Sequence, residues 1–93
     1  MIKTFRDANT EQLWTEERSR RIPPNVHKVG LRKLQMLNAA GALSDLIVPP
    51  GNRLEALEGD REGQHSIRVN DQYRICFVWR DGNAYEVEIT DYH

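Results

Sequence analysis

The fold is decided by an alternating stretch, residues 65–89, which reads HSIRVNDQYRICFVWRDGNAYEVEI. Apolar and polar side chains alternate along it with a period of two, the pattern of strands that bury one face. The alternation is interrupted at Asn70-Asp71 and at Asp81-Gly82, and both dipeptides indicate hairpin turns. A fourth candidate strand, residues 53–57, precedes the stretch and is joined to it by the glycine-bounded loop 59–63. The pattern therefore predicts a four-stranded antiparallel meander.

The phase of the alternation predicts which side chains of the sheet are buried. On the first candidate strand Leu54 and Ala56 share a face, and on the last strand Tyr85 and Val87 continue the apolar face. Residues 1–6 also alternate and could add a short strand at the start. The sheet is therefore expected to have one apolar face that another layer must cover.

Two N-terminal helices are expected to supply that layer. The first covers residues 10–21, and Ile22-Pro23-Pro24 ends it because proline is tolerated in a first turn but not in a helix interior. The second covers residues 24–40, where apolar side chains recur at helical spacing. Lys33 falls within that apolar arc and should extend its amine to solvent. Two helices packed on a twisted antiparallel sheet make an α+β fold.

Length and composition bound the function. The 93 residues are expected to form one compact domain, residues 1–93, with a modest core. Cys76 is the only cysteine, so there is no internal disulfide or thiolate metal cluster, and we expect a buried structural thiol. Three scattered histidines match no metal-ligand spacing, so no metal and no cofactor is expected. No signal peptide or membrane span is recognisable, which favours a cytoplasmic protein without a membrane partner.

The charges are segregated although the net charge is only −1. Residues 18–44 hold six basic side chains and no acidic one. A localised basic surface can bind phosphates with salt-dependent affinity, whereas many basic helix faces are only solvated. The first reading makes this stretch, together with Arg61 in the loop 59–63, a candidate RNA-binding surface. The candidates in the stretch are Arg18, Arg20, Arg21, Lys28, Arg32 and Lys33.

Two arginines flank the first hairpin turn. Counting from the turn places Arg68 and Arg74 near each other on adjacent strands, on the face away from the apolar side chains. Neighbouring guanidinium groups repel each other unless an anion lies between them. That anion could be a substrate phosphate, or the pair could belong to a surface ion-pair network. The carboxylates considered are Glu86, Glu88 and Asp91.

The chain ends on Asp91-Tyr92-His93, directly after the last strand. An acid, a phenol and an imidazole at this place could move protons or hold a phosphate. A short polar tail with no chemical role is the alternative interpretation.

Several ordered motifs together resemble the HigB toxins of the RelE/ParE superfamily of bacterial toxin–antitoxin systems. The resemblance is densest over residues 53–93 and weaker over residues 1–44. Its motifs are LEGDREG at 57–63, SIRVN at 66–70, YRICF at 73–77 and DYH at 91–93.

This resemblance implies a RelE-like fold, an mRNA endonuclease that cuts translated messages in the ribosomal A site, and a HigA-like helix-turn-helix antitoxin. It also implies a site on the exposed sheet face. Cutting RNA through its own 2′-hydroxyl needs a base, an acid and cations for the developing charge. We therefore interpret His93 as acid or phosphate clamp, Asp91 as its orienting partner, and Arg74 with Arg68 as phosphate stabilisers. Tyr92 would stack on a base or donate to the phosphate.

Two acids depart from the family pattern. Several relatives have histidine where this chain has Glu55, and lysine where it has Glu58. Glu55 could replace the histidine as the base that removes the 2′-proton. Alternatively, both carboxylates are solvated strand residues.

Two further functions remain open on sequence grounds. ParE-like relatives share the fold but inhibit DNA gyrase, and they generally lack such a terminal cluster. A small α+β module that docks its basic helix on an acidic protein is the third hypothesis.

Overall fold

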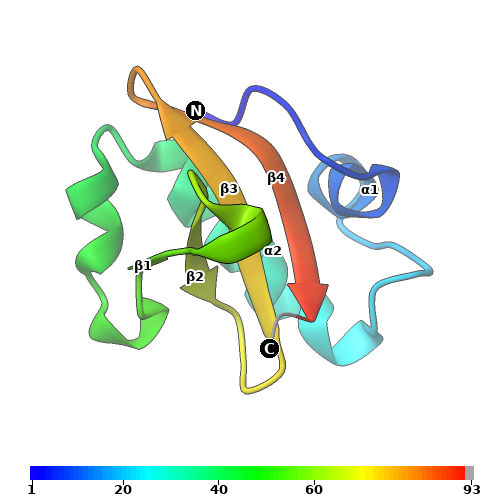
Figure 1. Cartoon of the computed structure of the whole chain (residues 1–93). Coiled ribbons are helices and arrows are strands. Elements are labelled where there is room, and N and C mark those ends of the chain that lie inside the picture. Colours follow the sequence, from blue (N-terminus) through cyan, green and yellow to red (C-terminus); the bar gives the residue numbers. More distant parts are fainter. Residues whose placement is uncertain (92–93) are drawn as a thin grey trace.

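The computed structural model describes residues 1–91 and contains two helices followed by a four-stranded sheet (Figure 1). The strands form one antiparallel sheet in the order β1-β2-β3-β4, so the predicted meander and the α+β fold are confirmed. The helices and strands are α1 (Ala8–Glu16), α2 (Pro24–Ala39), β1 (Glu55–Ala56), β2 (His65–Arg68), β3 (Tyr73–Arg80) and β4 (Asn83–Asp91). The short 3₁₀ helices are η1 (Leu43–Ile47), η2 (Pro50–Asn52) and η3 (Gly59–Arg61).

The sheet separates two layers. In Figure 1, α2 lies behind the sheet and α1 beside β4, while the segment of residues 57–63 with η3 crosses in front of β3. Ile75 pairs with Ile67 on β2 and with Ile89 on β4, and these side chains belong to the buried core. A Cβ on Gly30 of α2 would lie 3.2 Å from Ile89 Cδ1, so glycine lets this helix approach the sheet closely. The core therefore fills the α2 side and leaves the opposite face for polar residues. We call that opposite face the open face.

The first helix is shorter than the predicted residues 10–21. It ends at Glu16, and Glu17 takes a left-handed conformation with φ of 63° while its N–H donates to the carbonyl of Leu13 at 2.9 Å. The residues from 18 to 21 are all charged or polar, so no apolar contact would hold a further helical turn against the core. These basic residues lie in a loop.

Residues 1–6 do not form the short strand that the sequence suggested. Ile2 and Phe5 instead form isolated parallel bridges with Ala84 and Val87 of β4. Two separate bridges leave the rest of the segment outside the ladder, so residues 1–6 cover an edge without extending the sheet as a strand.

Because of a bulge in β4, Tyr85 lies on the opposite face of the sheet from the one predicted. Between two regular pairs, one residue of β3 is opposed by two residues of β4, and Glu86 in the bulge has a φ of 51°. The extra residue shifts the alternation, so Tyr85 pairs with Val78 on the open face. The Arg80 guanidinium carbon lies 4.5 Å from the centre of the Tyr85 ring, a cation–π contact.

The short first strand also differs from its prediction. Ala56 is exposed, and Leu57 is the buried residue of this segment. Only two residues pair with β2, so the segment leaves the ladder before the alternation can be extended. Within residues 1–91, none of the helices has the length and apolar character needed to cross a membrane.

Candidate active site

The open face presents a row of polar side chains around Arg74. Arg74 pairs with Arg68 on β2 and with Thr90 on β4, so the three side chains share one face. In the neighbouring row, Cys76 pairs with Ser66 and Glu88. The predicted juxtaposition of the two arginines is confirmed.

Arg74 is fixed by three partners on this face. Its Nε donates to Ser66 Oγ at 2.7 Å, and its Nη2 donates to the backbone carbonyl of Arg53 at 2.6 Å. A Glu55 carboxylate oxygen lies 3.6 Å from the same Nη2. The Arg74 side chain is only 14% exposed, so most of its movement is restricted by these contacts. An arginine held this way presents its remaining N–H groups in a fixed direction.

Arg68 is held less firmly than Arg74. It donates to Asp71 in the turn, and the Asp71 side chain is almost fully exposed. The alternative interpretation, an ion-pair network of the two arginines with Glu86 and Glu88, is therefore wrong, because the arginines pair with Asp71 and Glu55. An exposed partner of this kind can exchange for a phosphate at little cost.

Glu88 has a different role from the one predicted. Its carboxylate lies 2.7 Å from Arg61 Nη1 and 3.7 Å from Arg6 Nε, and Arg61 also donates to Gln64 at 3.1 Å. Arg61 belongs to η3, in the segment that crosses the open face (Figure 1). This ion pair therefore fastens the crossing segment to β4.

Cys76 lies beneath this cover and is fully buried. Burial raises the pKa of its thiol, and this effect outweighs the lowering by the Arg61 guanidinium; the Glu88 carboxylate raises the pKa further, while Arg74 and Arg6 lower it. A thiol that resists ionisation and is closed to solvent is a poor nucleophile. The predicted structural role of this cysteine agrees with its burial.

The last described residue lies at the end of β4. Asp91 pairs with Tyr73, whereas Thr90 is the residue opposite Arg74. Alternation thus turns the Asp91 side chain toward the other face of the sheet, where it accepts a hydrogen bond from Gln72 Nε2 at 2.9 Å. Tyr92 and His93 lie outside the described residues, so their assigned roles stay predictions.

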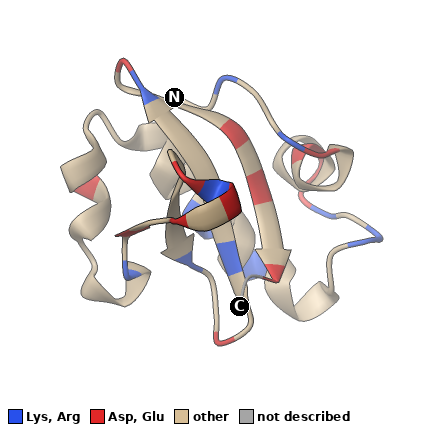
Figure 2. Ribbon diagram, in the orientation of Figure 1, with Lys and Arg blue, Asp and Glu red and all other residues tan. Residues whose placement is uncertain are grey.

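The predicted RNA-binding residues lie in the α1–α2 loop and on α2, except Arg61, which lies on the crossing segment. In Figure 2, basic residues recur along the loop between α1 and α2, whereas acidic residues gather on β4 and the crossing segment. The exposed residues among the predicted RNA-binding set are Arg18, Arg20, Arg21, Lys28 and Arg32. Lys33 differs because it is only 6% exposed, so the prediction that its amine reaches solvent is wrong.

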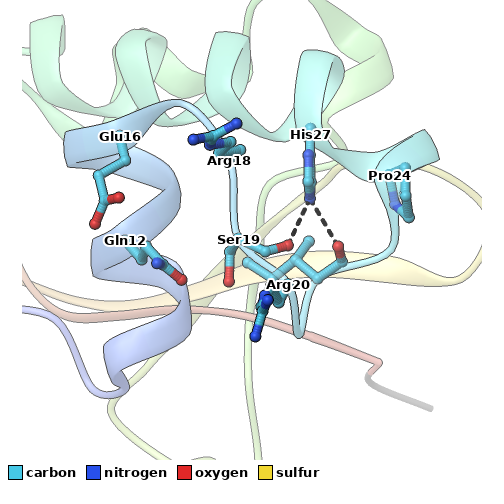
Figure 3. Close-up of a pocket in the computed structure, with 8 residues that line it drawn as sticks. Gln12, Glu16, Arg18, Ser19, Arg20, Pro24 and His27 are labelled. Carbon is cyan, nitrogen blue, oxygen red and sulfur yellow. Dashed lines mark hydrogen bonds between the residues drawn. The ribbon is translucent and has the colours of Figure 1, made fainter.

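Arg18 and Arg20 line a pocket of about 470 Å³ between the end of α1 and the start of α2. Glu16 contributes a carboxylate to the same pocket, and the two arginines point away from each other (Figure 3). His27 places Nε2 at 2.9 Å and 2.7 Å from the carbonyls of Ser19 and Ile22. It ties the loop to α2 and is a structural residue.

Sequence reasoning missed the groups that orient Arg74. Ser66 could have been found, because the hairpin register places it on the same face two residues before Arg68. The carbonyl of Arg53 gives no signal in the sequence, since any residue carries one. Among residues 1–91, no group of three His, Cys, Asp or Glu side chains could hold a metal ion.

The fold and this open face lead to a family. The family model described as RelE-like toxin of type II toxin-antitoxin system HigB matches residues 3–93. The chain belongs to the HigB family of toxins. It is 49% identical over 85 residues to Toxin HigB-1 of Vibrio cholerae, covering 90% of each chain. It is 34% identical over 98 residues to Endoribonuclease HigB of Proteus vulgaris, covering 100% of each.

The architecture of this HigB-family chain also matches a more distant solved structure. The YoeB-YefM complex from Staphylococcus aureus contains a chain that superposes with a TM-score of 0.61 at 13% identity, covering 100% of this chain and 98% of that one. At such low identity the likeness concerns the fold, which is RelE-like.

Proposed function

We propose that this HigB-family protein is a ribosome-dependent endoribonuclease that cleaves translated mRNA in the A site, in the cytoplasm. The Arg68–Arg74 pair on the open face carries the proposal, because two adjacent cations with one fixed guanidinium suit a phosphodiester. The Proteus vulgaris relative named as an endoribonuclease supports the activity.

The proposed chemistry uses the RNA's own 2′-hydroxyl. The 2′-oxygen attacks the adjacent phosphorus, the bond from phosphorus to the 5′-oxygen breaks, and a cyclic phosphate and a 5′-hydroxyl result. Arg74 and Arg68 stabilise the charge that develops on the phosphoryl oxygens. The reaction needs no metal, because proton transfers and charge stabilisation can all come from side chains.

Glu55 is the proposed base. Its carboxylate lies 3.6 Å from Arg74 Nη2 and its side chain is 52% exposed, which supports a base beside the proposed phosphate position that substrate can reach. His93 is the proposed acid for the leaving 5′-oxygen, and Tyr92 the proposed stacking platform. Asp91, at the end of β4, is the proposed orienting partner of His93, although its own side chain turns away from the open face and accepts a hydrogen bond from Gln72.

The exposed basic residues of the α1–α2 loop and of α2 form the proposed contact with ribosomal RNA. Phosphate contacts of this kind position a protein without reading sequence. The ribosome would then supply the substrate geometry that the small open face lacks. A HigA-like helix-turn-helix antitoxin is the proposed partner that neutralises the protein, as expected for a type II system.

The test compares purified protein on a translated message with and without ribosomes. Cleavage that needs ribosomes and fails in Arg74→Ala supports the proposal, and Arg80→Ala on the same strand is the matched control. Inhibition of DNA gyrase with intact mRNA would favour the ParE-like alternative instead. Normal growth on induction would favour a binding module.

A further inference from the structure

Lys33 has no role in the proposed reaction, yet it is buried and bonded to another segment of the chain. Its side chain is buried, and Nζ donates to Oδ1 of Asn52, which is fully buried. A lysine amine in the interior is costly unless it has a partner. The contact joins α2 to η2, which leads into the first strand.

The Asn52 amide is engaged on its other side as well. Its Nδ2 donates to the carbonyl of Leu46 at 3.1 Å and contacts Met36 Sδ at 3.2 Å. Asn52 is thus held at once by α2 and by η1. A side chain with every polar atom engaged and no exposure has one position available.

This anchor fixes the next residue, Arg53. Its backbone takes a left-handed conformation with φ of 46° and ψ of 54°, and its N–H donates to the carbonyl of Pro50 at 3.1 Å. Such a conformation is unfavourable for a non-glycine residue and persists only where neighbouring contacts impose it. The result is a carbonyl that accepts a hydrogen bond from Arg74 Nη2 at 2.6 Å.

We propose that Lys33 and Asn52 are positioning residues for Arg74. They hold the Arg53 carbonyl, and that carbonyl fixes the direction in which the Arg74 guanidinium faces the open face. The effect on cleavage rests on the proposed function, whereas the effect on the guanidinium does not.

Without the anchor, Arg74 keeps the bond from Nε to Ser66 Oγ and a longer bond of 3.4 Å from Nη2 to the Ser66 carbonyl, but it loses the fixed acceptor that Nη2 has at 2.6 Å in the Arg53 carbonyl. The guanidinium then rotates more freely and spends less time aligned with the phosphate. Misalignment of this kind lowers the rate of the chemical step by about tenfold or more. It leaves substrate binding on the ribosome nearly unchanged, so kcat falls while KM stays.

The first experiment follows Arg74 by NMR in the full-length protein. We expect rotation of its guanidinium to be slow in the wild type and faster in Lys33→Met and in Asn52→Ala. Lys3→Met makes the same chemical change at an exposed position and should leave Arg74 unchanged. Equal rotation in the wild type and folded Lys33→Met would overturn the proposal.

The second experiment measures cleavage in a double-mutant cycle with Arg74→Lys, which keeps a measurable residual rate. Lys33→Met should lower kcat in the wild-type background and have much less effect beside Arg74→Lys, because that variant has no guanidinium to align. A loss of the same factor in both backgrounds would mean that Lys33 only supports the fold, and would refute the positioning role.

Two provisions keep the outcomes separate. If Lys33→Met does not fold, the pair Lys33→Met and Asn52→Leu removes donor and acceptor together and takes its place in both experiments. If the wild type cuts no RNA, the proposed function fails, and the NMR comparison still decides the positioning role.

Discussion

Arg68 and Arg74 face each other across β2 and β3, yet only Arg74 is held on several sides. Ser66 and the carbonyl of Arg53 bind its guanidinium, whereas Arg68 has an exposed carboxylate as its partner. The pair thus combines one fixed cation with one that can adjust. This difference gives each arginine a distinct expected behaviour on substitution.

Arg74→Lys should abolish most cleavage although it keeps the positive charge. A lysine amine cannot engage Ser66 and the Arg53 carbonyl at the same time in the fixed geometry of the guanidinium fork. We expect a fall of about hundredfold in the cleavage rate on ribosomes. Arg68→Lys, whose partner is exposed, should lose much less. Equal losses from both substitutions would contradict the distinction between them.

The Arg61–Glu88 pair should contribute to stability, unlike the Arg68–Asp71 pair. Both members of the first pair are mostly buried, and Glu88 also faces Arg6. Glu88→Ala should lower the free energy of unfolding by roughly 1–3 kcal/mol, because it leaves the buried Arg61 without this partner. Asp71→Ala is the matched control and should change nothing measurable. Urea unfolding of both variants makes the comparison, and a stable Glu88→Ala would exclude the fastening role.

The stability of the protein should respond to the titration of Lys33. Desolvation lowers the pKa of its amine below the ordinary value of 10.5, and the neighbouring Arg32 and Arg68 charges lower it further. Between the lowered pKa and 10.5 the unfolded chain binds more protons than the folded one, so this group makes the free energy of unfolding rise with pH. The free energy of unfolding of the wild type minus that of Lys33→Met should therefore increase with pH in this window. A difference that stays flat would show that the amine is solvated.

Ribosome binding should depend on the exposed basic residues but not on Lys33. Charge reversal at Lys28 and Arg32 should weaken binding and reduce the salt slope by about one for each lost phosphate contact. Lys3→Glu, which removes an exposed lysine elsewhere, serves as the control. The salt dependence of ribosome co-sedimentation gives the slopes. An unchanged slope after both reversals would place the ribosome contact on another surface.

The sequence predicted the features that depend on periodicity. The alternating stretch 65–89 gave the hairpins and placed Arg68 opposite Arg74, and the prolines at residues 23–24 marked the start of α2. The left-handed Glu86 was not predictable, because its conformation depends on contacts with a distant segment, including Thr4 Oγ1, which accepts from Glu86 N at 2.8 Å.

The candidate site was predicted only in part, for a related reason. Arg74 could be placed on a face by counting, but its orientation depends on the Arg53 carbonyl, which lies 21 residues away in sequence. Lys33 was predicted to extend its amine from the apolar arc to solvent, because helical spacing alone does not reveal the buried Asn52 that accepts its hydrogen bond. Tertiary contacts, which local patterns do not contain, set these features.

The most direct test of the central claim is sequencing of mRNA ends after induction of the wild type, Arg74→Ala, Arg80→Ala and a variant lacking His93. We predict breaks within translated codons for the wild type and Arg80→Ala, and their loss in the other two. The same breaks in Arg74→Ala, or none in the wild type, would contradict an RNA-cleaving site on the open face.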